Sequence, residues 1–302
     1  MTSNEKDLLA MKEAGMIDEA SFETMWNDLQ SRKPSYNSAA TEAIILDDEA
    51  EAAPYQGIKL LAGAYSSKGI REQNEDSFFL GDTTGGAKET DSAVYSAEGD
   101  GPYFFAAADG MGGHDAGDVA STFVVTKLKM SVSHQTAFAD DSVIEIMLKG
   151  IHAELIAEAK ARGTPKMGST IAGIILQKEN SGFFNAGDSR VYRLRHNYIQ
   201  QISEDDSLSR FVPNAAKNVI TNAVGAGQEN MSVSSRFAAG FAVKGDVFLM
   251  CSDGVHGAIG DDDLAFFLGL NDSPQDIARI IVERAIQNNS DDNCTAVVVK
   301  YI

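Results

Sequence analysis

The chain has 302 residues, of which 43% are hydrophobic and 23% charged, so it can bury a full core in one large domain or two small ones. Its formal net charge is -19, and it contains no run of Lys or Arg. Phosphate backbones and anionic membranes attract clustered basic residues, so this composition argues against a nucleic-acid partner and against an anionic membrane surface.

The sequence also lacks signals for secretion and membrane insertion. No stretch approaches the roughly 20 apolar residues that span a bilayer, and the opening MTSNEKDLLA has no basic start followed by an apolar segment. We therefore expect a cytoplasmic protein with no membrane span. Cys251 and Cys294 lie in apolar segments, so we expect buried free thiols rather than a disulfide or a metal site.

Residues 1–30 predict a helical hairpin. Gly15 can end the first helix, Asp18 can cap the second, and Ile17 with Phe22 fits a hydrophobic staple. Two short helices cannot bury an apolar face by themselves, so we expect the hairpin to pack on its own domain, to self-associate or to dock to a partner.

An acidic linker and the main domain are expected to follow. Residues 31–56 combine Ser, Ala, Pro and acids without a sustained period, which is typical of a linker. The main domain is then expected to occupy residues 57–302.

The pattern of apolar residues in the main domain changes period several times. Strands are predicted over residues 58–65, 77–80 and 103–108, an exposed Gly-containing loop over 83–91, and helices over 119–130 and 142–161. Later strands are predicted over residues 171–176, 182–186, 190–195, 198–202, 232–237, 247–251 and 293–299, and later helices over 262–268 and 274–288. Runs of strands alternate with pairs of helices, which favours an α+β layered fold over a parallel doubly wound one.

Residues 103–121, YFFAAADGMGGHDAGDVAS, suggest a metal site at the end of a strand. The apolar run ends at Asp109, whose two carboxylate oxygens can bridge cations, and Gly110 leaves its backbone carbonyl open for coordination. An Asp-Gly pair after a strand is also compatible with an ordinary turn.

The same pattern recurs, because acids stand beside predicted strand ends in four other places. These are REQNED at 71–76, FFNAGDSRVY at 183–192, VFLMCSDGV at 247–255 and DDNCTAVVV at 291–299. Carboxylates and carbonyls select Mg²⁺ or Mn²⁺, and no Cys/His spacing suited to zinc is present.

Over residues 57–302 the chain resembles the bacterial form of the metal-dependent Ser/Thr protein phosphatases, the PPM or type 2C family, through these five ordered motifs. The resemblance implies a four-layer α-β-β-α sandwich of two antiparallel sheets flanked by helices. It also implies a binuclear Mg²⁺ or Mn²⁺ site at one edge of the sandwich.

The resemblance assigns roles to individual acids of the motifs. Asp109 is similar to the carboxylate that bridges both metals, with the Gly110 carbonyl on one of them. Asp253 and Asp292 resemble ligands of the other metal. Asp188 resembles the residue that holds a third, weaker ion in bacterial members.

Further roles follow from the motifs at 71–76 and 291–299. Glu75 and Asp76 resemble acids that serve the second metal directly or through water, and Asn293 resembles a partner that orients Asp292. Arg71 resembles the arginine that grips the substrate phosphate. Arg71 could instead pair with Glu72 or Glu75.

Asp188 has an alternative structural reading as well. It could form a salt bridge with Arg190 at the end of a strand instead of holding an ion.

The implied activity is hydrolysis of phosphoserine and phosphothreonine in proteins, opposing a bacterial Ser/Thr kinase. Two cations would activate a water molecule and neutralise charge on the transferring phosphoryl group. The alternative is a catalytically weak relative that acts as a phosphoprotein-binding or scaffold module.

Three positions depart from the family pattern. Relatives carry a histidine directly after the Asp-Gly pair, where this chain has Met111, so His114 is a candidate proton donor but could equally be a loop or packing histidine. An acid that helps the third metal in relatives is replaced by Gly257.

The flap between Ser207 and Asn218 is short, LSRFVPNAAK, which predicts a more open cleft and altered substrate choice.

The predicted domain boundary can be tested by truncation. Deleting residues 1–55 is expected to leave hydrolysis of para-nitrophenyl phosphate unchanged, because the predicted site lies wholly in the main domain. Loss of turnover in a truncated protein would show that the segment is part of the catalytic domain.

Overall fold

The computed structural model describes residues 57–302 except 113–115, 134, 136, 139 and 211–218. The larger of two compact units comprises Gln56–Ser207 and Ile220–Ile302. Of the other unit, the structure describes Val219 and the single 3-10 turn η1 (Leu208–Arg210), in which the Leu208 N–H donates to the Val219 carbonyl. The predicted hairpin at 1–30 and linker at 31–56 lie outside the described residues.

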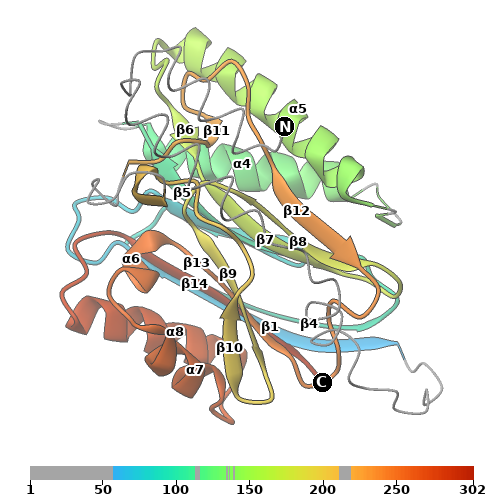
Figure 1. Cartoon of the computed structure of the whole chain (residues 1–302). Helices are drawn as coiled ribbons and strands as arrows, with labels where there is room; N and C mark the ends of the chain where they lie inside the picture. The colour runs from blue at the N-terminus through green and yellow to red at the C-terminus, as the bar shows by residue number, and fades with distance from the viewer. Residues whose placement is uncertain (1–56, 113–115, 134, 136, 139, 211–218) are drawn as a thin grey trace, which may run out of the picture. The chain divides into compact units, whose positions relative to one another are not determined.

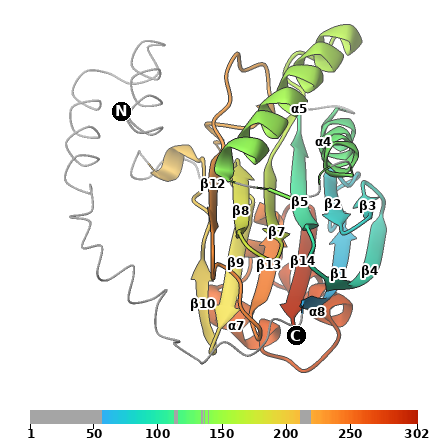
Figure 2. The same ribbon diagram turned by 90° about the vertical axis from the view of Figure 1, so that its right-hand side faces the viewer.

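One of the two inner layers of the main unit is a six-stranded sheet in which every neighbouring pair is antiparallel (Figure 1). Its order is β10 (Tyr198–Gln201), β9 (Arg190–Arg195), β13 (Val247–Cys251), β14 (Cys294–Tyr301), β1 (Ile58–Ser67) and β4 (Thr90–Gly99). Figure 2 shows β1 and β4 side by side at one edge, where they pair over ten residues each.

The second sheet has eight strands, again antiparallel. Its main path is β11 (Val224–Gly225), β6 (Gly168–Ser169), β5 (Tyr103–Met111), β7 (Ile171–Leu176), β8 (Ser181–Ala186) and β12 (Ser234–Ala238), and β5 also pairs with β2 (Asp76–Leu80), which pairs with β3 (Thr83–Gly86). The central strand β5, which carries Asp109, therefore pairs with three other strands, β2, β6 and β7.

Helices cover the outer face of each sheet (Figure 1). Helices α4 (Gly117–Val132) and α5 (Asp141–Arg162) share a core with the eight-stranded sheet. Helices α7 (Asp261–Leu268) and α8 (Pro274–Gln287) share another with the six-stranded sheet, and a third core fills the space between the sheets. The predicted α-β-β-α sandwich is therefore confirmed, and no helix in the described part of the chain is long and apolar enough to cross a membrane.

The strand period explains this three-core arrangement. In β2, Phe79 packs toward the helices, whereas Phe78 and Leu80 pack between the sheets. In β5, Phe104 and Phe105 separate in the same way. Because successive side chains point to opposite faces, a strand buried on both faces reads as a continuous apolar run.

Most predicted elements are confirmed within a few residues, and β7, β9 and β13 match their predicted bounds. The exposed loop predicted at 83–91 is wrong, because it contains β3 and the start of β4. Strand β4 was missed altogether: its inward side chains include Ala93 and Ala97, which are small, and its outward ones are mostly polar. Its alternation is therefore weak, although it pairs with the full length of β1.

Both cysteines are buried free thiols, as expected, and lie on the helix-facing side of β13 and β14. Burial raises the pKa of the Cys294 thiol to about 12 and also raises that of Cys251. Raised pKa values disfavour the reactive thiolate, so both residues serve packing.

Gly63 lets α8 lie directly on β1, and this contact can be tested. A Cβ at Gly63 would lie 2.2 Å from the Gln275 nitrogen and 2.6 Å from the Pro274 carbonyl carbon, which are backbone atoms that cannot rotate away. Gly63→Ala is therefore expected to lower the free energy of unfolding by about 1–3 kcal/mol in urea denaturation. Gly150→Ala, where a Cβ meets nothing within 4 Å inside α5, should raise it by roughly 0.5–1 kcal/mol. Equal effects at the two positions would contradict the packing explanation.

Candidate active site

The core between the two sheets ends in a layer of polar side chains. In β2 the inward positions Phe78 and Leu80 are preceded by Asp76, and in β5 the inward positions Phe105 and Ala107 are followed by Asp109. Asp76 and Asp109 are register partners, so their side chains stand next to each other on one face of the sheet.

Hydroxyl groups at the same inward positions of other strands hold Asp76. Ser252 follows β13 and donates from Oγ to Asp76 Oδ2 at 2.7 Å, and Ser252 Oγ also accepts from the Thr295 N–H at 3.0 Å. Thr295 Oγ1 lies 2.7 Å from Ser66 Oγ. Asp76 Oδ1 is buried and has no hydrogen-bond partner, so one carboxylate oxygen is fixed while the other stays available.

A second hydroxyl network positions Asp109 and Asp188. The Asp109 N–H donates to Thr170 Oγ1 at 2.9 Å, and the Thr170 N–H donates to the Asp109 carbonyl at 2.8 Å. Thr170 Oγ1 is 2.7 Å from Ser189 Oγ, beside Asp188. Thr170 therefore joins the end of β5 to the turn that carries Asp188.

Asp188 does not pair with Arg190, so that hypothesis is wrong. Arg190 makes a two-pronged ion pair with Asp205, with Nε 2.9 Å from Oδ1 and Nη2 2.7 Å from Oδ2. Asp188 Oδ1 is instead buried without a hydrogen-bond partner, and the backbone carbonyl of Asp188 lies 3.0 Å from His256 Nε2.

Asp253 begins the short helix α6 (Asp253–His256), which packs tightly on β14. A Cβ at Gly254 would lie 2.0 Å from the Asn293 carbonyl oxygen, so only glycine allows this approach. Asp253 Oδ1 is buried and unpartnered. Burial, followed by the Asp292 charge, raises the pKa of Asp253.

Arg71 lies on the loop between β1 and β2 and reaches the start of β14. Its Nε donates to the Asp291 carbonyl at 2.6 Å and its Nη2 to Asp292 Oδ2 at 2.7 Å. The Asn293 N–H donates to Asp292 Oδ1 at 2.8 Å, so both oxygens of Asp292 accept hydrogen bonds. The ion pair that the structure shows for Arg71 is thus with Asp292, not with Glu72 or Glu75.

Glu75 lies against the first turn of α4. A Cβ at Gly117 would come within 2.5 Å of the Glu75 carboxyl carbon, so the carboxylate lies directly against the backbone of this turn. Gly110 contacts both Glu75 and Gly117. Its N–H donates to the Glu75 carbonyl at 3.1 Å, and a Cβ at Gly110 would lie 1.9 Å from the Gly117 carbonyl oxygen. The helix N-terminus, where backbone N–H groups are free, thus receives a carboxylate.

These acids raise one another's pKa values. Burial, followed by the Asp253 and Asp292 charges, raises the pKa of Asp76 to about 7, while hydrogen bonds from Ser252 and Thr295 oppose the rise. Burial and the Asp253 charge likewise raise the pKa of Asp188 to about 7. The pKa values of Glu75, Asp109, Asp253 and Asp292 are also raised, with burial the largest cause in each. The cluster is therefore short of positive charge.

The donor set fits hard cations. Three buried carboxylate oxygens, on Asp76, Asp188 and Asp253, lack any partner, and all are ligands that Mg²⁺ and Mn²⁺ prefer. As arranged here, however, no three His, Cys, Asp or Glu side chains in the described part of the chain stand close enough to hold one ion together. The backbone gathers the acids, and closing on an ion requires side-chain rotation.

Three features of the site were missed or lie beyond description. The supporting hydroxyls of Ser66, Thr170, Ser189, Ser252 and Thr295 were not predicted, although most fall at inward positions of their strands. His256 was not singled out either. His114 lies outside the described residues, so its role as a proton donor stays a prediction.

Comparison with known proteins gives a consistent result. The family model for protein phosphatase 2C matches residues 83–290. Serine/threonine phosphatase stp of Listeria welshimeri is 29% identical over 210 residues, which are 64% of this chain and 82% of that protein. Serine/threonine protein phosphatase PstP of Mycobacterium tuberculosis is 28% identical over 257 residues, 79% of this chain and 44% of that protein.

Solved structures resemble the chain over most of its length. PppA of Pseudomonas aeruginosa aligns with a TM-score of 0.65 at 28% identity, covering 80% of this chain and 98% of that one. The catalytic domain of PstP in complex with two manganese ions aligns with a TM-score of 0.66 at 25% identity, covering 81% and 99%.

The raised pKa of Asp76 predicts an unusual pH dependence in metal-free protein. A carboxyl group that titrates near 7 when folded and near 4 when unfolded holds its proton more tightly in the folded state, so stability falls as pH rises between those values. In EDTA, Tm is expected to fall from about pH 5 to about pH 7.5. Asp76→Asn should make this slope shallower, although Asp188, whose pKa is also raised to about 7, still contributes to it, and Glu179→Gln, at an exposed bend, should leave it unchanged. A Tm that rises over this range in the wild type would contradict the assignment.

Proposed function

Because the chain belongs to the protein phosphatase 2C family, we propose that it hydrolyses phosphoserine and phosphothreonine in proteins at a binuclear Mg²⁺ or Mn²⁺ centre formed by its acidic strand ends. The family's enzyme class, protein-serine/threonine phosphatase, agrees with its curated relatives stp and PstP. The observation that carries the proposal is the group of acids at one end of the inter-sheet core, three of which have a buried oxygen without a partner.

The residues divide by position. Asp109, the register partner of Asp76, would hold the two ions together with Asp76, Asp253 and the Gly110 carbonyl. Asp292 would complete the set once its carboxylate turns from Arg71 toward an ion. When bound, the ions would supply an activated water molecule and neutralise charge on the phosphoryl group.

Arg71 would bind the phosphoryl group of the substrate. Its guanidinium offers several N–H donors in one plane, and its side chain is 51% exposed, so it can contact Asp292 and still face a ligand. In the metal-free protein the Arg71 charge partly compensates Asp292 and Glu75, whose pKa values it lowers.

Asp188 offers fewer neighbouring ligands for a third ion than the other acids do for the first two. Asp188 has a buried free oxygen, but the fourth residue after Asp253 is Gly257, and a Cβ there would lie 2.8 Å from the Asp253 carbonyl. We therefore propose two tightly held ions and, at most, weak occupancy beside Asp188.

The relatives indicate the class of substrate. Bacterial Ser/Thr phosphatases such as stp and PhpP are among them, and the proposed partner is a Ser/Thr kinase whose phosphoproteins this enzyme would dephosphorylate. Residues 1–30 are proposed to serve docking or self-association, and the short flap at residues 208–217 to affect substrate choice.

The test is hydrolysis of a phosphothreonine peptide and of para-nitrophenyl phosphate in Mn²⁺, in EDTA, and by Asp253→Asn. Turnover should require metal, and Asp253→Asn should reduce kcat by at least ~100-fold, since even outer partners of metal ligands cost 10–100-fold. Asp262→Asn, on the exposed first turn of α7, is the matched control and should retain activity.

The contrary outcome is equally specific. A folded wild type that binds Mn²⁺ and phosphopeptide but hydrolyses neither compound would contradict catalysis and support a phosphoprotein-binding module.

A further inference from the structure

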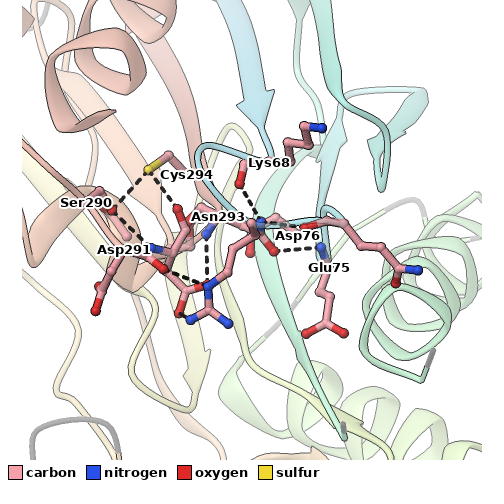
Figure 3. Close-up of polar contacts among 12 residues, drawn as sticks. Lys68, Glu75, Asp76, Ser290, Asp291, Asn293 and Cys294 are labelled. Atoms are coloured by element: carbon pink, nitrogen blue, oxygen red, sulfur yellow. Dashed lines mark hydrogen bonds and ion pairs between the residues drawn. The ribbon is translucent and has the colours of Figure 1, made fainter. Parts of the chain in front are cut away.

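The side chain of Asn293 occupies the centre of the loop between β1 and β2, residues 68–75, which we call the arginine loop (Figure 3). Asn293 Oδ1 accepts from the Glu75 N–H at 2.8 Å, and Nδ2 donates to the Lys68 carbonyl at 2.9 Å and to the Gln73 carbonyl at 2.8 Å. The residue is only 5% exposed. One carboxamide thus bonds both limbs of the loop.

Arg71 lies between these two anchored limbs. The Arg71 N–H donates to the Lys68 carbonyl at 3.1 Å, which is the same carbonyl that Asn293 holds. The direction of the guanidinium toward Asp291 and Asp292 therefore depends on a turn whose base is fixed by Asn293.

The orientation of Asp292 does not need the Asn293 side chain. The contact with Asp292 Oδ1 comes from the backbone N–H of Asn293, which any residue except proline would supply. The side chain instead bonds the arginine loop, which connects β1 to β2. The expectation that Asn293 orients Asp292 is thus met by its backbone only.

We propose that Asn293 is a positioning residue for phosphate binding that acts through Arg71, by clamping the arginine loop. This inference rests on the proposed function, in which Arg71 contacts the phosphoryl group. The same bonds also fix Glu75 through its N–H, so the clamp couples the phosphate-binding arginine to the acid that faces α4.

The chemistry of the position explains the residue type. The loop presents one N–H and two carbonyls to it, and a carboxamide offers one acceptor and two donors in one plane. Aspartate has the same shape but cannot donate when ionised, and it would add a charge beside Asp292 and Glu75, whose pKa values are already raised.

The first test is a double-mutant cycle with inorganic phosphate as the probe. At saturating Mn²⁺, Asn293→Ala is expected to raise the inhibition constant for phosphate and the KM for para-nitrophenyl phosphate by about tenfold, the size expected from losing a well-buried hydrogen bond. In an Arg71→Ala background, Asn293→Ala should change the inhibition constant no further. Additive effects, or an unchanged constant in the single variant, would overturn the inference.

The second test needs neither metal nor activity. Lys68 and Arg71 are trypsin sites within the loop, so Asn293→Ala should speed cleavage at both, as followed by mass spectrometry of the intact protein. Asn293→Asp keeps the acceptor for the Glu75 N–H and loses both donors. Like Asn293→Ala, it should speed cleavage and raise the phosphate inhibition constant, and it provides a second variant in case the alanine variant does not fold.

Asn222→Ala is the matched control. Asn222 is 6% exposed and also makes three hydrogen bonds, to Asp206 Oδ2 at 2.6 Å and to the Ser232 carbonyl and N–H at 2.9 and 3.0 Å. It should lower Tm without raising the phosphate inhibition constant or cleavage at Lys68 and Arg71. An equal effect of both variants would show a general loss of stability and refute the clamp.

Failure of the inference and failure of the proposed function give different results. Wild-type protein that binds phosphate by calorimetry in Mn²⁺ but hydrolyses nothing contradicts the function, and the cycle can then be run on binding. Normal turnover with no change in Asn293→Ala contradicts the clamp only. Absence of phosphate binding in the wild type contradicts both.

Discussion

The mutual repulsion of carboxylates buried between two sheets is the constraint on which the site depends. Asp76 and Asp109 are direct cross-strand partners, an arrangement that destabilises a sheet when both are ionised. Asp253 begins a helix pressed onto β14 by Gly254, so a third acid cannot retreat from them. Burial and the neighbouring charges raise the pKa values of Asp76, Asp109 and Asp253, which favours their protonated forms when no cation is bound. Bound divalent ions would reduce the repulsion between the carboxylates by neutralising their charge.

The same strand period explains why the acids meet in one place. The side chains of β2, β5, β7 and β14 that face the other sheet are apolar along most of each strand. At or next to one end of each strand, the inward position instead carries an oxygen-bearing side chain. The ends coincide because all neighbouring strands are antiparallel and their registers are fixed by the buried apolar residues. The stability of the core and the geometry of the site therefore have one origin.

The sequence predicts most of this architecture because the strands that bear the site are buried on both faces. Residues 103–108 and 171–176 are continuous apolar runs, and both strands were correctly located. The edge strand β4 was missed because small and polar residues, such as Ala93 and Ser92, carry its alternation. Edge strands need satisfy only one neighbour, so their composition is less constrained.

The site was predicted as a set of acids but not as a network. Motif spacing indicates which carboxylates stand at strand ends, yet it does not show that Arg190 prefers Asp205 or that Arg71 reaches Asp292, because those pairs join residues 15 and 221 positions apart. Neutral serines and threonines are common at strand ends, so nothing in their spacing marks Ser252 or Thr170 as supports of acids.

The polar groups of the site divide by charge as well as by position. Neutral hydroxyls hold Asp76 and lie beside Asp188, and a neutral carboxamide holds the arginine loop, so none of these supports competes with a cation for the acids' charge. A lysine or arginine in the place of Ser252 would neutralise the charge of Asp76 and so weaken its attraction for a metal ion. Arg71, whose side chain is 51% exposed, pairs with Asp292 Oδ2 at the edge of the group. Supports that orient acids without neutralising them are what the proposed metal-dependent phosphatase site requires of its protein.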